Sequence, residues 1–213
     1  MLTVKKFTFN PFSENTYVIS DELKNSVIID PGCYYKAEQD ELERYILNNN
    51  LNLKSILHTH SHLDHIFGTA YLAKKYDLDL WISKEDLVTY QSYEKVCEVY
   101  GIPIIFSPNP TPKFFDLRKE INFGTIIFKI LFVPGHSPGH VAFYNKENKF
   151  LINGDCLFES SIGRTDLPGG NHEQLISSIK NEIFQLPDET IVYCGHGNET
   201  TIKMEKSSNP FLR

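Results

Sequence analysis

The sequence predicts an α/β protein in which two β-sheets pack face to face and helices cover their outer faces. Two observations lead to this prediction. Short apolar segments of strand length come first, strands and amphipathic helices then alternate, and the second half of the chain repeats this order. Hydrophobic residues make up 41% of the 213 residues, enough for a sizeable core, and no Gly- or Ser-rich linker divides the chain. We therefore expect one domain over residues 1–213.

The elements of the first half follow from the spacing of apolar residues. Short apolar runs separated by Pro, Asn and Asp predict a strand meander. Leu42, Tyr45 and Ile46 share one face of a predicted helix that ends at a run of Asn. The predicted order is strands over 4–9, 16–20 and 26–30, a helix over 36–50, a strand over 53–58, a helix over 66–76, a strand over 78–83 and a helix over 84–100.

A proline-rich segment separates the two halves. Residues 101–115 contain four prolines, which disfavour regular structure, so we expect a surface loop or a lid. The second half then predicts strands over 125–135, 141–145 and 150–154, a helix over 172–184 and a strand over 190–195.

Composition and charge narrow the function classes. The net charge of -6 and the absence of basic runs argue against a nucleic-acid partner or binding to an acidic membrane. No apolar stretch approaches the roughly 20 residues of a membrane-spanning helix, and the N-terminal segment lacks the apolar core of a signal peptide. We therefore expect a cytoplasmic protein. Its four cysteines lack CxxC spacing and are expected to be free, buried thiols.

The stretch LHTHSHLDH (57–65) holds four of the eight histidines. His60 and His62 are two residues apart, so in extended backbone their side chains point the same way. Asp64 and His65 follow at the turn into the next helix. The stretch therefore offers two nitrogens to one metal ion, and an oxygen and a nitrogen to a second. The alternative is a solvated polar loop.

Three more residues of ligand type occupy comparable positions. His136, Asp155 and His196 each follow an apolar strand and adjoin glycine, which lets backbones approach closely. Each of them alone would more often be a structural residue, but together they favour a metal site. Imidazole and carboxylate groups suit zinc, iron or manganese.

These motifs together resemble the metallo-β-lactamase superfamily. The segments LHTHSHLDH, VPGHSPGH, NGDCLF, GRTDLPGG and YCGHGNET are most similar to those of the short glyoxalase II-like (hydroxyacylglutathione hydrolase-like) hydrolases. The resemblance implies an αββα sandwich of two mixed β-sheets, the metallo-β-lactamase fold, with two divalent metal ions at one edge. Zinc is the expected metal, and iron and manganese are the alternatives.

The resemblance also implies roles for individual residues. Metal one would be held by His60, His62, His136 and Asp155. Metal two would be held by Asp64, His65, His196 and the same Asp155 as a bridge. The implied function is a metal-dependent hydrolase of thioesters of the hydroxyacylglutathione type, in which a metal-bound hydroxide is the nucleophile and Asp64 helps to orient it. The expected partner is a small-molecule substrate, a glutathione or other thiol ester.

Arg164 occupies the position of a basic residue that contacts glutathione in full glyoxalase II. The resemblance therefore implies a substrate-binding role, and an ion pair with Asp166 is the equal alternative. Asp166 itself stands where the family has an aromatic contact, and the family's C-terminal glutathione-binding helical domain is expected to be missing. Two other functions stay open. One is a mononuclear iron persulfide dioxygenase, which shares the GRTD loop, and the other is a non-catalytic metal-binding relative.

Four further polar residues lie near these motifs. His58 and His140 fit no ligand position and are expected to be packed in the core or to orient a ligand. Asp30 resembles a family position that supports the metal site through hydrogen bonds, with a simple Asp-Pro turn as the alternative. His172 is expected to be a polar residue at a helix start.

Overall fold

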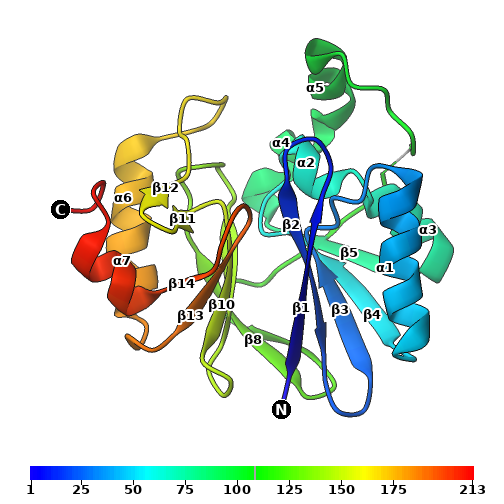
Figure 1. Cartoon of the computed structure of the whole chain (residues 1–213). Helices are drawn as coiled ribbons and strands as arrows, with labels where there is room; N and C mark the ends of the chain where they lie inside the picture. The colour runs from blue at the N-terminus through cyan, green and yellow to red at the C-terminus, as the bar shows by residue number, and fades with distance from the viewer. Residues whose placement is uncertain (108) are drawn as a thin grey trace.

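The computed structural model describes residues 1–107 and 109–213. Two mixed β-sheets face each other, and helices cover the outer face of each sheet (Figure 1). The predicted αββα sandwich is confirmed. The first sheet has the strand order β1-β2-β3-β4-β5-β6, and the second has the order β14-β13-β10-β9-β8-β7.

The first half builds the first sheet and the helices outside it. Its elements are β1 (Thr3–Phe9), β2 (Glu14–Ser20), β3 (Asn25–Ile29), α1 (Lys36–Asn48), β4 (Asn52–Leu57), α2 (Leu63–Ile66), α3 (Thr69–Tyr76), β5 (Asp79–Ile82), the 3-10 helix η1 (Lys84–Asp86), α4 (Leu87–Gln91), α5 (Tyr93–Tyr100) and β6 (Lys113–Phe114). Strands β1 to β3 are antiparallel, whereas β3 to β6 are parallel. Parallel neighbours need crossover connections, and helices supply them here.

The second half repeats this plan. Its elements are β7 (Glu120–Phe123), β8 (Ile126–Phe132), β9 (Val141–Asn145), β10 (Phe150–Gly154), β11 (Leu157–Phe158), β12 (Ser161–Ile162), α6 (His172–Asn181), the 3-10 helix η2 (Ile183–Gln185), β13 (Ile191–Cys194), β14 (Thr200–Thr201) and α7 (Ile202–Ser208). Strand β10 pairs with β9 in antiparallel and with β13 in parallel orientation. Helices α6 and α7 cover the outer face of this sheet (Figure 1).

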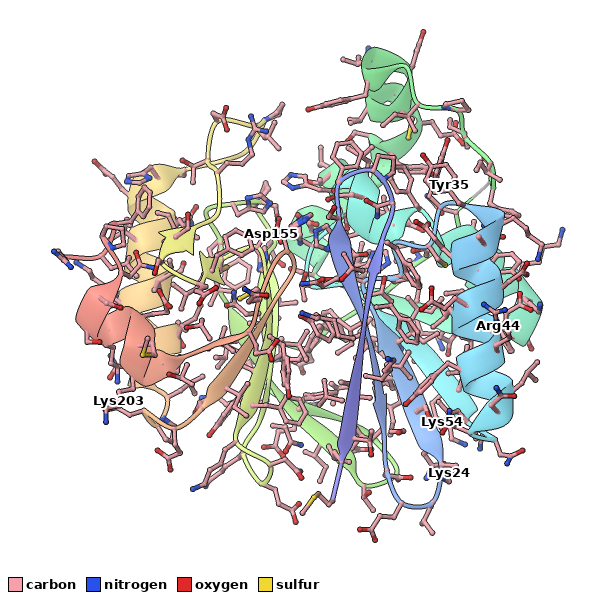
Figure 2. All side chains as sticks on the ribbon, in the orientation of Figure 1. Lys24, Tyr35, Arg44, Lys54, Asp155 and Lys203 are labelled. Carbon is pink, nitrogen blue, oxygen red and sulfur yellow. The ribbon has the colours of Figure 1, made fainter. Side chains whose placement is uncertain are left out.

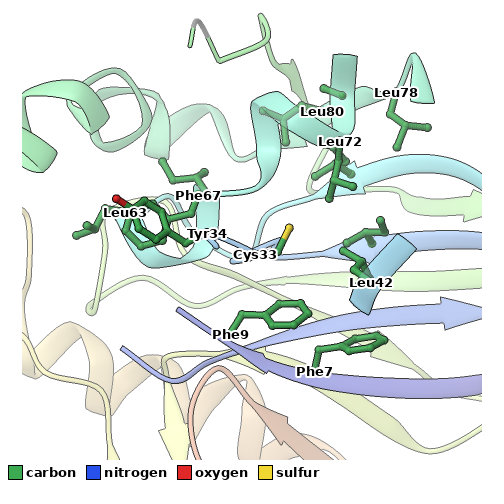
Figure 3. Close-up of a cluster of buried hydrophobic side chains, with 14 of the residues drawn as sticks. Phe7, Phe9, Cys33, Tyr34, Leu42, Leu63, Phe67, Leu72, Leu78 and Leu80 are labelled. Atoms are coloured by element: carbon green, nitrogen blue, oxygen red, sulfur yellow. The ribbon is translucent and has the colours of Figure 1, made fainter. Parts of the chain in front are cut away.

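Strands β2 and β3 of the first sheet are buried on both faces. In β2, Tyr17 and Ile19 pack between the two sheets, whereas Val18 faces the helix layer. Alternate side chains of a strand point to opposite faces, so a strand buried on both sides needs an apolar residue at almost every position. Figure 3 shows the helix side of this sheet, where Phe7 and Phe9 lie beside Leu42 of α1.

Two predicted helices are interrupted. The helix predicted over 66–76 is divided at Gly68. A Cβ atom at this position would overlap the Cys33 sulfur, so glycine lets α2 and α3 pack closely against the segment that follows β3. The helix predicted over 84–100 is divided into η1, α4 and α5. The Ser92 hydroxyl donates to the Thr89 carbonyl at 2.7 Å, a local bond that favours a bend.

Other differences concern boundaries and short elements. The segment predicted as a loop over 101–115 contains β6 and the buried Phe115, because the last proline precedes Lys113; residue 108 lies outside the described residues. The helix predicted over 172–184 ends at Asn181. In the described chain all four cysteines are buried and free, as predicted. No helix among the described residues is long and apolar enough to cross a membrane.

Candidate metal centre

The loops that follow the strand ends meet at one edge of the sandwich. The His/Asp-rich stretch follows β4 and enters α2, whereas His136, Asp155 and His196 follow β8, β10 and β13. Asp155 lies between the two halves of the molecule near the strand ends (Figure 2). The structure therefore brings together all seven residues that the sequence predicted as metal ligands.

The first donor group consists of His60, His62 and His136. One nitrogen of each lies within 4.8 Å of the others, and His62 Nδ1 is 2.8 Å from His136 Nε2. The remaining nitrogens are held by hydrogen bonds: His136 Nδ1 donates to the Arg164 carbonyl at 2.8 Å, and His60 Nδ1 lies 3.0 Å from Thr59 Oγ1. This arrangement fixes the orientation of the rings, as is typical of metal-binding histidines.

The second donor group consists of Asp64, His65 and His196, again within 4.8 Å of one another. His196 Nδ1 lies 3.1 Å from the Phe12 carbonyl, which directs Nε2 to Asp64 Oδ2 at 3.2 Å. His65 Nδ1 lies 3.2 Å from Asp30 Oδ2. Both histidines therefore present Nε2 to the centre.

Asp155 lies between the two groups. Its Oδ2 is 3.6 Å from His136 Nε2 and 3.4 Å from His196 Nε2, and its Oδ1 is 3.6 Å from His65 Nε2. His140 Nε2 accepts the Asp155 backbone N–H at 3.0 Å. A Cβ at Gly195 would overlap Asp155 Oδ1, so glycine is needed beside the carboxylate.

The charges of the two groups differ. Burial lowers the pKa of His60 well below its usual range and, with His136 nearby, lowers the pKa of His62 to about 3. Burial also disfavours the charged form of His196, but the hydrogen bonds that it donates to Asp155 and Asp64 raise its pKa to about 10. His60 and His62 are therefore neutral, the form that binds metals, whereas His196 carries a proton that a metal ion would displace.

The donor set fits a pair of divalent cations. His60 Nε2, His65 Nε2 and Asp155 Oδ1 are buried without a hydrogen-bond partner among the described residues. Buried polar atoms are normally paired, so these three atoms fit a site in which a bound cation would be their partner. Imidazole nitrogens and carboxylate oxygens are the donors that zinc, iron and manganese accept.

Asp30 lies beneath this centre. Its Oδ1 accepts the Thr59 N–H at 2.7 Å, and its Oδ2 accepts the Thr59 hydroxyl at 2.5 Å and faces His65. It thereby anchors the start of the histidine stretch and one ring of the second group. His58 is buried nearby, with Nε2 2.9 Å from Thr69 Oγ1.

Sequence reasoning missed two buried carboxyl groups near the centre. Glu14 on β2 accepts the Thr16 hydroxyl at 2.9 Å, and its Oε1 lies 3.8 Å from His65 Nδ1. Burial raises the pKa of Glu14 well above its usual value. Asp86 accepts the Gly139 N–H at 3.3 Å and lies beside the hydroxyls of Ser61 and Ser137, so it connects the loops that carry the first donor group.

Neither carboxyl group had a signal in the sequence. Glu14 is a single acidic residue at the start of an apolar strand, and Asp86 lies within a segment predicted as one helix. Only contacts between distant segments show their position.

A cleft of about 1110 Å³ opens over the centre. Its floor includes His62, Asp64, His136, Asp155 and His196, and its walls come from α4, α5 and the loop over 158–169. Five predicted ligands are therefore accessible to a small molecule.

Arg164 lies at the rim of this cleft. Its Nε and Nη2 atoms donate to the two oxygens of Asp166 at 2.7 and 2.8 Å, and both side chains are exposed. The Arg164 guanidinium is thus paired within its own loop. The backbone carbonyl of Arg164 separately accepts a hydrogen bond from His136 Nδ1.

Comparison with known proteins identifies the family. Residues 9–196 match the model of the metallo-beta-lactamase superfamily. The chain belongs to the metallo-β-lactamase superfamily. Among its superfamily relatives, hydroxyacylglutathione hydrolase GloC of Haemophilus influenzae is 40% identical over 94% of this chain and 93% of the relative. The probable metallo-hydrolase YqgX of Bacillus subtilis is 35% identical over 98% of this chain and 96% of the relative.

Solved metallo-β-lactamase-fold structures agree with this assignment. TTHA1623 in a di-iron-bound form has a TM-score of 0.87 and 37% identity, covering 98% of this chain and 100% of that chain. BLEG-1, described as a B3 metallo-β-lactamase, has a TM-score of 0.86 and 35% identity, covering 99% of both chains. ETHE1 from Myxococcus xanthus is more distant, with a TM-score of 0.78 and 26% identity over 98% of this chain and 83% of that chain. The comparisons support a metal-dependent hydrolase.

Proposed function

We propose that the protein uses two divalent metal ions to hydrolyse thioesters of the hydroxyacylglutathione type. Zinc is the expected metal. The observation that supports the proposed hydrolysis most strongly is the pair of donor groups on either side of Asp155 at the floor of an open cleft. The relative GloC, at 40% identity, bears the name of this activity.

Bound dications would supply an activated water and polarise the acyl carbonyl. The residues of the chain position the reacting groups. His60, His62 and His136 would hold one ion together with Asp155, and Asp64, His65 and His196 would hold the other with the same Asp155. Asp64 is the proposed catalytic residue, because its carboxylate faces the cleft and can orient the attacking water. Arg164 is proposed to exchange Asp166 for a carboxylate of the substrate.

A mononuclear iron persulfide dioxygenase is the second candidate. The GRTD loop at the rim of the cleft favours it. The complete second donor group favours the hydrolase instead, because a mononuclear enzyme would not require Asp64, His65 and His196 as ligands. A non-catalytic relative is disfavoured by the open cleft, because structural metal sites are usually closed.

Metal analysis combined with two assays tests the proposal. The purified protein is expected to contain two metal ions per chain and to hydrolyse lactoylglutathione without releasing sulfite from glutathione persulfide. His60→Ala and Asp155→Ala are expected to lose bound metal and turnover together. Full turnover with either variant, or oxygen-dependent sulfite release with one iron per chain, would overturn the assignment.

A further inference from the structure

One wall of the cleft is apolar although it faces solvent. Val88 of α4 is 76% exposed and Val99 of α5 is 75% exposed, and Tyr100 and Phe12 beside them are also exposed. Helix α5, whose side chains line the cleft, projects beyond the sandwich (Figure 1). A group of exposed apolar side chains that adjoins a reactive centre indicates a binding surface.

The charged groups of the cleft do not suit a strongly anionic ligand. Of the described lining residues, Lys95 and Arg164 are the cationic side chains apart from the histidines of the centre. Arg164 is already neutralised by both oxygens of Asp166, and Glu159 adds a negative charge to the opposite wall. For the two carboxylates of a glutathione group the cleft therefore offers Lys95 and, once it releases Asp166, Arg164, and the rest of the substrate faces largely uncharged side chains.

We propose that the apolar wall, formed by Phe12, Val88, Val96, Val99 and Tyr100, binds an extended apolar arm of the thioester substrate. This inference rests on the proposed thioester hydrolysis. The wall lines the same cleft as the five accessible ligands, so an arm attached to the reacting thioester reaches it. Both the acyl chain and the thiol can carry such an arm.

Two series of thioesters test the inference and distinguish the two sources. One series lengthens the acyl chain of N-acetylcysteamine thioesters from acetyl to octanoyl, and the other lengthens the alkanethiol of acetyl thioesters. We expect kcat/KM to rise about two- to fourfold per methylene in one series until the wall is covered. Flat profiles in both series would overturn the inference.

A matched pair of variants locates the effect. Val99→Asp is expected to lower the ratio of octanoyl to acetyl kcat/KM by about tenfold, because it puts a charge where the arm packs. Leu23→Asp is the control, since Leu23 is 76% exposed and lies outside the cleft. If Val99→Asp instead converts a dimer into a monomer in sedimentation without changing this ratio, a second copy of the chain covers the wall and the inference is wrong.

Binding of thioethers separates this inference from the proposed function. S-alkyl thioethers of N-acetylcysteamine cannot be hydrolysed, and their affinity for the metal-loaded protein can be measured by calorimetry. If no thioester is cleaved but affinity rises with alkyl length and falls in Val99→Asp, the apolar wall stands and the proposed reaction is wrong. If thioesters are cleaved without dependence on length, the reaction stands and the inference is wrong.

Discussion

At the residue scale, the histidines of the centre depend on the partners of their second nitrogens. His136 and His196 use backbone carbonyls, and His65 uses Asp30. Backbone partners cannot rotate away, so the His136 and His196 rings need little ordering when a metal binds. The Arg164 carbonyl thereby has a structural role that is independent of its side chain.

The Arg164 side chain can be tested apart from that role. We expect Arg164→Ala to raise KM for anionic thioesters about two- to fivefold with a smaller change in kcat, since an exposed pair that must first release Asp166 contributes at most about 1 kcal/mol. Steady-state kinetics measure this. Arg118→Ala is the control, because Arg118 makes the same two-pronged pair with Asp116 outside the cleft. An unchanged KM would leave Arg164 with its backbone role alone.

Asp86 is expected to support the first donor group through the loops of Ser61 and Ser137. Asp86→Ala should destabilise the metal-free protein by about 1–3 kcal/mol, because it leaves the buried Gly139 N–H unpaired, and should also weaken metal binding. Urea unfolding and competition with a chelator measure the two effects. Asp21→Ala is the control: Asp21 is a buried acceptor for Asn25 and Thr125, away from the cleft, and its loss should cost stability alone. Equal metal affinity in both variants would contradict the role of Asp86.

At the element scale, the sequence predicted the longer strands better than the helices, but the short strands β6, β7, β11, β12 and β14 were not predicted. The apolar runs of β4, β10 and β13 end close to the predicted positions, because each run stops at the polar or glycine-rich segment that carries a predicted ligand. The bend at Ser92 has no periodic signal, since α4 and α5 both continue an apolar pattern. Strands β6 and β14 have two residues each, too few for any pattern, and tertiary pairing alone defines them.

The same limit applies to the candidate site. Its seven proposed ligands share strand ends and glycine neighbours, which a sequence shows, whereas Glu14 and Asp86 act through neighbours distant in the chain. A single acidic residue without a characteristic spacing cannot be recognised from the sequence as part of a metal site.

The break between α2 and α3 makes Gly68 sensitive to substitution. Gly68→Ala would place a Cβ against the Cys33 sulfur and 2.9 Å from the Pro31 carbonyl, so we expect a loss of about 1–3 kcal/mol in the free energy of unfolding. Urea denaturation measures it. In Cys33→Ala/Gly68→Ala the sulfur is gone, and the loss should be smaller than the sum of the two single losses. If the loss in the double variant equals the sum of the two single losses in the free energy of unfolding, Cys33 does not cause the strain.

At the scale of the whole molecule, the centre lies where the two sheets meet. Strand β2 of the first sheet reaches the second: the Asn15 N–H donates to the Gly195 carbonyl at 2.7 Å, and the Tyr17 hydroxyl donates to the Cys194 carbonyl at 2.6 Å. These bonds hold the end of β13, and therefore His196, against the first half. The proposed ligands come from both halves, so a bound metal pair would join them.

Metal removal should therefore lower the stability of the whole fold. A ligand that binds only the folded state at a thousand times its Kd adds about 4 kcal/mol, which corresponds to a rise in Tm of about 10 °C for a chain of this size. Calorimetry of chelated and metal-loaded protein measures the difference. Asp155→Ala should show little rise on metal addition, because Asp155 lies between both donor groups. An equal rise in this variant would mean that metals bind elsewhere, and no rise in the wild type would mean that the two halves are held together without them.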